Sequence, residues 1–185
     1  KVGKMSTVGK QIKVEMEFDG KKVEELYDRV LVSVGRAANS VDLGLDNTKV
    51  TLDEKGFVKV NSQQQTSDPH IYAIGDIAGG ILLAHKAHKE ARVAVESING
   101  ENSVMENVVI PAVVFTDPEL AWCGLTEAEA KAKGIPYEVS KFPWAASGRA
   151  LSFDRTDDLT KLIIEPETER IVGVGIVRHN AGELI

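Results

Sequence analysis

The residue pattern with the most specific chemistry lies between residues 66 and 76, which read Thr-Ser-Asp-Pro-His-Ile-Tyr-Ala-Ile-Gly-Asp. An apolar run at 71–74 is followed by Gly75 and Asp76, and ligands of open α/β sheets bind where strands end. Gly75 would let a ligand approach the backbone closely because it lacks a Cβ, and the Asp76 carboxylate could accept a hydrogen bond from a sugar-alcohol hydroxyl. An ordinary Gly-Asp turn is the alternative, but Thr66 and Tyr-Ala-Ile at this spacing favour a binding site.

A second candidate site is Gly35-Arg36, which ends the apolar run of residues 30–34. A backbone amide and a guanidinium at the end of a strand would suit a phosphate or a nicotinamide nucleotide. A solvated arginine in a turn is the alternative. His85 and His88 have a spacing found in metal sites, but no carboxylate or thiol pattern completes such a site, so we predict no bound metal.

The elements that would position these residues can be read from hydrophobic spacing. Residues 11–18 alternate polar and apolar side chains, which predicts a half-buried strand. Asp19-Gly20 is a hairpin turn signal, with the return strand at 22–26. The unbroken apolar run at 30–34 predicts a strand buried on both faces. Shorter strands are expected at 56–60 and at 71–74.

The second half of the chain predicts helices and strands in turn. Apolar residues at three- and four-residue steps predict a helix over about 84–98 with one apolar face, and Gly100 stands at the position of a C-terminal cap. The apolar residues are Ala84, Ala87, Ala91, Ala94, Val95 and Ile98. Thr126 and Glu129 form a capping-box pattern that would open a second helix. Strands are expected at 108–115, where Pro111 interrupts the run, and at 137–142, 160–164 and 171–177.

Composition places the chain in the globular class. It has 185 residues, 43% of them hydrophobic and 27% charged, with a net charge of −6. An acidic balance without a basic run argues against nucleic-acid or anionic-membrane binding. No apolar stretch approaches the ~20 residues that span a bilayer. The single cysteine, Cys123, excludes an internal disulfide. With no signal sequence and no initial Met, we expect a soluble cytoplasmic piece of a larger protein.

Residues 66–76 resemble the second flavin-binding motif of the FAD-dependent pyridine nucleotide–disulfide oxidoreductases. Other segments resemble the same family in the same order, and the likeness, greatest for its dihydrolipoamide dehydrogenase branch, runs from about residue 11 to the end. These segments are the strand and Gly-Arg that close the NAD domain at 30–36, the flavin-facing stretch at 82–87, the opening of the dimerisation domain at 114–121, and a helix start at 181–185.

The resemblance implies FAD and NAD as cofactors and assigns residues to each. Asp76 would hold the ribityl chain of FAD, and Gly35 would contact the nicotinamide nucleotide. A stretch at a helix N-terminus would meet the flavin through its backbone amides, and it consists of Leu82, Leu83, Ala84 and His85.

The implied fold class is α/β and α+β, with remnants of two cofactor domains followed by most of an α+β dimerisation domain. The NAD-binding part would occupy residues 1–46, the FAD-binding part 47–107, and the dimerisation domain 108–185, through which the protein would form a homodimer. The aromatic cluster at 142–144 would belong either to that subunit interface or to the core.

The chemistry of the family is only partly represented in these residues. There is no Gly-x-Gly-x-x-Gly, Cys123 has no cysteine partner, and the family's His-x-His-Pro would follow Ile185. We therefore expect a fragment without catalytic residues of its own, from a parent that oxidises dihydrolipoyl groups of 2-oxo acid dehydrogenase complexes. The alternatives are a mercuric reductase, a glutathione reductase or a soluble transhydrogenase, or a non-catalytic dimerisation module.

Overall fold

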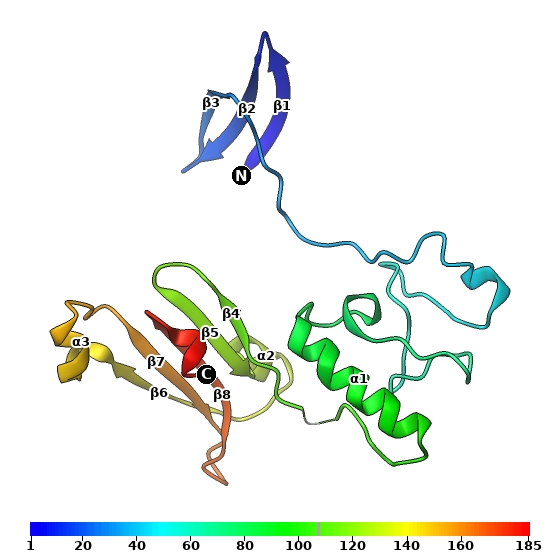
Figure 1. The fold of residues 1–185 in the computed structure, drawn as a ribbon. Helices are drawn as coiled ribbons and strands as arrows, with labels where there is room; N and C mark the ends of the chain where they lie inside the picture. The colour runs from blue at the N-terminus through cyan, green and yellow to red at the C-terminus, as the bar shows by residue number, and fades with distance from the viewer. Residues whose placement is uncertain (107) are drawn as a thin grey trace. The chain divides into compact units, whose positions relative to one another are not determined.

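The structure is a computed structural model that describes residues 1–106 and 108–185 (Figure 1). Two compact units, Lys1–Ala37 and Ala38–Ile185, divide the chain. Both contain antiparallel sheet, and the second also contains helices, so the predicted mixture of α and β structure is confirmed. The domain boundary expected at residue 107 lies outside the described residues.

The first unit is a three-stranded antiparallel sheet in the order β1-β2-β3. The strands predicted from alternation are confirmed, and Asp19 and Gly20 take φ values of 48° and 73° in the turn between them. The alternation rule does not predict the first strand, because its pairing with the second contains a register shift near Val2 and Met5. The strands are β1 (Val2–Val8), β2 (Gln11–Phe18) and β3 (Lys21–Tyr27).

The strand predicted at residues 30–34 is wrong, since this segment has no regular structure. Leu31 is 91% exposed and Val34 is 92% exposed. A strand needs a hydrogen-bonded neighbour, and no described strand pairs with this apolar run. Gly35 follows it with a φ of 136°, in an exposed position.

Residues 38–83 of the second unit are mostly turns and loops, with the short 3-10 helices η1 (Leu45–Asn47) and η2 (Gly75–Ala78). The strands predicted at 56–60 and 71–74 are wrong, because each is reduced to a single bridge. Their backbone groups bond to other loops instead, as where the Val58 amide donates to the Ile77 carbonyl at 2.8 Å. The loop segments therefore support one another without a sheet.

Helix α1 (Ala84–Ile98) has the predicted bounds, and Gly100 takes a φ of 87° just after it. The predicted apolar face is buried only in part. Val95 and Ile98 are 65% and 63% exposed. The buried residues of the helix are Lys86, Glu90, Val93 and Ala94.

The remainder of the second unit is a five-stranded antiparallel sheet in the order β4-β5-β8-β7-β6 (Figure 1). Its core includes Ala121, Ile176 and Ala181. The predicted strands are confirmed except that β4 begins only after Pro111, and β5 has no counterpart among the predictions. The strands are β4 (Ala112–Val114), β5 (Glu119–Gly124), β6 (Glu138–Pro143), β7 (Leu159–Ile164) and β8 (Ile171–Arg178).

Short helices lie between these strands, and one follows the last strand. The predicted capping box is confirmed at the start of α2, where the Thr126 side chain accepts from the Glu129 amide and the Glu129 side chain accepts from the Thr126 amide. The helices are α2 (Glu127–Ala132), η3 (Trp144–Ala146), α3 (Gly148–Ser152) and η4 (Ala181–Glu183). Among the described residues, no helix has the length and apolar character that crossing a membrane requires.

Candidate cofactor site

The turn that carries Asp76 is packed against helix α1. Gly75 is buried and takes a φ of 78°, which a residue with a side chain rarely adopts. A Cβ at this position would also come within 3.4 Å of the Ala87 Cβ. The positive φ therefore favours glycine here, whereas the distance to Ala87 is an ordinary van der Waals contact. Asp76 follows Gly75 as an exposed residue at the start of η2.

Two buried charged residues of α1 hold this turn. Lys86 donates from Nζ to Glu90 Oε1 at 2.7 Å and to the Gly79 carbonyl at 2.9 Å, and a longer bond of 3.3 Å reaches the Gly75 carbonyl. The second oxygen of Glu90 accepts from the Gly75 amide at 2.7 Å. Lys86 is 4% exposed and Glu90 is 6% exposed. The pair thus satisfies backbone groups at both ends of η2, which is where Asp76 lies.

The residue pattern does not reveal these two residues as part of a site. Lys-Glu pairs four residues apart are common on solvent-facing helix surfaces, as is Arg92–Glu96 on the same helix, where the Arg92 side chain is 73% exposed. The one signal that could have found them is their place on one helix face, because Glu90 lies three and four residues before Val93 and Ala94, and Lys86 lies one turn before Glu90.

The N-terminal end of α1 presents the predicted flavin-facing stretch. Leu82 and Leu83 are half-buried, and Ala84 and His85 are exposed. Leu83 is the N-cap residue, but no side chain caps the helix, and no acidic residue stands in its first turn. The first amides of a helix lack partners within it and carry its positive partial charge. This end of α1 can therefore accept an anionic or carbonyl-bearing group.

His85 also connects the helix to the chain that leads into β4. Its Nε2 lies 2.6 Å from the backbone carbonyl oxygen of Pro111, so the ring is oriented with Nε2 as the donor. A cavity of about 740 Å³ lies beside this contact and is mainly apolar. Its walls include Leu83, Ala84, His85, residues 108–111 and Phe115.

Five of the six predicted cofactor residues therefore lie within residues 76–85, on one turn and the helix that supports it. The sixth, Gly35, lies in the other compact unit. The roles of all six residues stay predictions.

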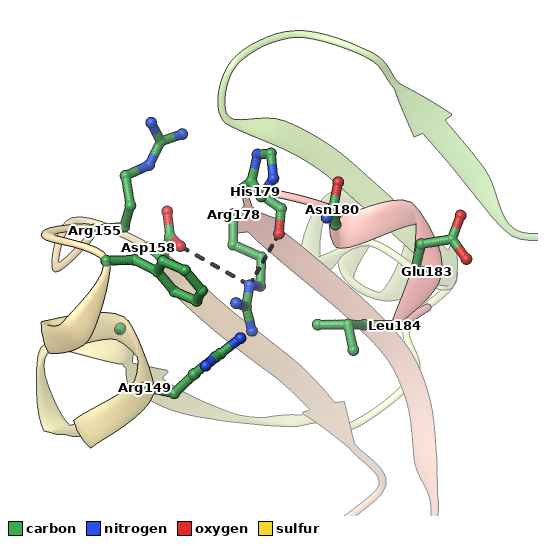
Figure 2. A pocket seen from close by; sticks show the side chains of 10 residues that line it. Arg149, Arg155, Asp158, Arg178, His179, Asn180, Glu183 and Leu184 are labelled. Carbon is green, nitrogen blue, oxygen red and sulfur yellow. Dashed lines mark hydrogen bonds and ion pairs between the residues drawn. The ribbon is translucent and has the colours of Figure 1, made fainter.

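A different cavity, of about 500 Å³, opens beside the end of β8, as Figure 2 shows. Arg149 and Arg178 reach toward the same space (Figure 2). Arg178 stacks 4.0 Å over the Trp144 ring, and its Nε lies 4.0 Å from an oxygen of the buried Asp158. Trp144 is half-buried in the single chain. None of the six predicted residues lines this cavity.

The lone cysteine is not set up for redox chemistry. Cys123 is partly buried in β5, and this burial raises the pKa of its thiol, which disfavours the reactive thiolate. Among the described residues, no three histidine, cysteine or acidic side chains gather as a metal site would require.

Two models of known protein families match this chain. The one described as pyridine nucleotide-disulphide oxidoreductase matches residues 1–91, and the one described as the dimerisation domain of the same group matches residues 110–185. The two matches follow one another along the chain and leave only a short segment between them.

Curated relatives agree with these matches. The chain is 47% identical to a dihydrolipoyl dehydrogenase of Vibrio parahaemolyticus over 93% of its own length and 37% of the relative's. It is 51% identical to one of Buchnera aphidicola over 86% of its own length and 34% of the relative's. The chain thus spans about a third of the length of these relatives.

Solved structures show the same likeness in three dimensions. LpdA of Mycobacterium tuberculosis matches with a TM-score of 0.86 at 27% identity, covering 100% of this chain and 40% of that one. The HOCl-induced flavoprotein disulfide reductase RclA of Escherichia coli, in its Cu(II) complex, matches with a TM-score of 0.83 at 25% identity, covering 100% of this chain and 41% of that one.

Proposed function

Because this chain belongs to the pyridine nucleotide-disulphide oxidoreductases, we propose that it is a segment of a flavoenzyme that oxidises dihydrolipoyl groups and reduces NAD⁺. The observation that carries the proposal is the turn at residues 75–79, which presents the Asp76 carboxylate and is bound to a helix whose N-terminus is uncapped. The 44–51% identity to dihydrolipoyl dehydrogenases supports this substrate class.

The residues of the site suit FAD chemically. The Asp76 carboxylate would accept hydrogen bonds from ribityl hydroxyls, and the first amides of α1, at Leu83, Ala84 and His85, would face the polar edge of the ring system. A cavity of about 740 Å³ adjoins this end of the helix, within the size range of small-molecule sites. FAD supplies the two-electron chemistry when bound. The residues of this chain would position the flavin, form hydrogen bonds to it and keep water away from it.

The other roles that we propose follow the three predicted domains. Residues 1–46 would complete an NAD-binding domain, in which Gly35 contacts the nucleotide, and residues 47–107 would complete the FAD-binding domain. Residues 108–185 would form a homodimer interface, which the match to a dimerisation domain over 110–185 supports. The protein would act in the cytoplasm on lipoyl groups carried by 2-oxo acid dehydrogenase complexes.

The redox disulfide and the acid–base pair would come from residues outside this chain. Relay of two electrons through a disulfide needs two thiols, and the sequence contains one cysteine. Removal of a thiol proton needs a base held within hydrogen-bond reach of the substrate. We assign neither role to a residue of this chain.

The experiment that tests the proposal uses the full-length protein in which this segment stands, called the parent protein below. The purified parent should show the visible spectrum of bound flavin and should reduce NAD⁺ when dihydrolipoamide is added. Three other reactions should be slow. They are the reduction of oxidised glutathione by NADPH, the reduction of Hg(II) by NADPH, and hydride transfer between NADPH and NAD⁺. If the parent protein catalyses any of these reactions faster than the oxidation of dihydrolipoamide, the proposed substrate class is wrong. A colourless parent protein would contradict the flavoenzyme proposal.

A further inference from the structure

We propose that Lys86 and Glu90 are positioning residues, which set the direction of the Asp76 carboxylate and so the affinity of the site for flavin. The inference rests on the proposed function, because it assumes that Asp76 contacts the cofactor. It concerns the buried ion pair of α1, which joins the helix to the two ends of η2.

The contacts of the pair are directed at backbone atoms on either side of Asp76. Glu90 accepts from the Gly75 amide just before it, and Lys86 donates to the Gly79 carbonyl three residues after it, at 2.7 Å and 2.9 Å. Turning the carboxylate by rotation of this short segment would break one or both bonds. The backbone on both sides of Asp76 is therefore coupled to the helix through these two side chains.

The attraction between the two charges does not by itself account for a buried pair of this kind. Removing two charges from water costs about as much as their attraction returns, so well-packed apolar residues often stabilise a protein equally well. Apolar side chains, however, would leave the Gly75 amide and the Gly79 carbonyl without these partners. The ion pair provides both a donor and an acceptor at one place, which a turn without strand neighbours needs.

The same helix carries the stretch that we assign to the flavin ring. Ala84 and His85 precede Lys86 directly, so the pair fixes the spacing between that stretch and Asp76. Two contact points held at a constant separation would bind the cofactor with less loss of conformational freedom in the protein.

The test compares variants of the parent protein on the buried pair with variants of an exposed pair on the same helix. Lys86→Met removes the donor to Gly79, and Glu90→Gln keeps the size of the side chain while removing its charge. Arg92→Met and Glu96→Gln are the matched controls, since that pair has the same four-residue spacing on the same helix and its Arg92 side chain is 73% exposed. The measurements are the flavin dissociation constant, the melting temperature, and hydrogen exchange of the Gly75 amide in flavin-free protein.

We expect Lys86→Met to raise the flavin dissociation constant roughly ten- to a hundredfold and Glu90→Gln about tenfold. Both should speed exchange of the Gly75 amide, and the controls should change neither quantity. A lowered melting temperature with unchanged flavin affinity and unchanged Gly75 exchange would show a purely structural role and overturn the inference. If Lys86→Met does not fold, the flavin dissociation constant and the Gly75 amide exchange of Glu90→Gln test the inference instead.

Asp76→Ala separates this inference from the function on which it rests. Weaker flavin binding in Asp76→Ala, with normal binding in both buried-pair variants, would contradict the positioning role and leave the proposed function in place. Unchanged flavin binding in Asp76→Ala would contradict the proposed contact itself.

Discussion

Gly124 in β5 and Gly173 in β8 are register partners, and neither position has room for a Cβ. A Cβ on Gly173 would overlap the carbonyl oxygen of Leu125, and one on Gly124 would overlap the carbonyl oxygen of Val172. The two backbones approach here because the Leu125 amide donates to the Val172 carbonyl at 2.8 Å, just where the chain leaves β5 for α2. Close backbone contact therefore ties the start of the connection from β5 to α2 to β8, the central strand of the sheet.

Replacing Gly173 with alanine should lower the free energy of unfolding of the parent protein by about 3 kcal/mol or more, because backbone atoms would have to move. Gly175, two residues along the same strand, has open space around its Cβ position. Gly175→Ala should therefore be neutral or stabilising by up to about 1 kcal/mol. Urea unfolding of both variants measures the difference, and equal effects would contradict the close approach.

Asp76→Ala should weaken flavin retention by the parent protein roughly ten- to a hundredfold, because charge-assisted hydrogen bonds to the cofactor contribute about 1.5–3 kcal/mol each. Asp76→Asn should have a smaller effect, since an acceptor oxygen remains. Glu54→Ala, which changes another exposed acidic residue of the same unit, is the control. Flavin absorbance after dilution and gel filtration measures retention, and equal retention in all three variants would argue against the contact.

Thr126→Ala should destabilise the parent protein by about 1 kcal/mol, because the amide of Glu129 loses its side-chain acceptor at the start of α2. Thr126→Ser keeps the hydroxyl and should restore most of the loss. Chemical denaturation at neutral pH measures both. A serine variant as unstable as the alanine variant would show that the threonine acts through its methyl group instead.

The same capping box predicts a dependence on pH. The Thr126 amide donates to Glu129 and holds the pKa of that carboxyl below its ordinary value of 4.5. A lowered pKa means that this contribution to stability is complete above pH 4.5 and is lost as the pH falls through the folded-state pKa. The difference in stability between the natural protein and Glu129→Gln should therefore shrink on acidification. A difference that stays constant below that pH would contradict the assignment.

The 185-residue chain by itself should show no oxidation of dihydrolipoamide, even with added FAD and NAD⁺, because Cys123 has no partner thiol within it. It should still associate if its five-stranded sheet faces a twofold partner. Turnover and sedimentation measured on one preparation test both statements. Turnover would overturn the assignment of the redox groups to other residues, and a monomer at high concentration would overturn only the dimer.

The colour of that preparation distinguishes two readings of the isolated chain. A yellow protein with the spectrum of bound flavin would show that residues 76–85 hold the cofactor on their own. A colourless dimer would favour the non-catalytic dimerisation module.

The sequence alone predicted the features that depend on residues only a few positions apart. The bounds of α1, the turn at Asp19-Gly20 and the capping box at Thr126 all agree with the structure. Each depends on local rules of helix spacing, positive φ and side-chain capping, which operate over a few residues. The motif that ends at Asp76 is also local, because its resemblance lies in consecutive residues, but the role of Asp76 stays a prediction.

The tertiary structure decided features whose partners are distant in sequence. The apolar run at 30–34 reads as a buried strand, but a strand exists only where another strand supplies hydrogen bonds, and no described strand does so. Hydrophobic spacing likewise placed Val95 and Ile98 on the apolar face of α1, and both are exposed. The helix instead packs on a turn whose buried backbone polar groups are not paired in a sheet, and Lys86 and Glu90 are buried there because they can satisfy those groups while apolar side chains cannot.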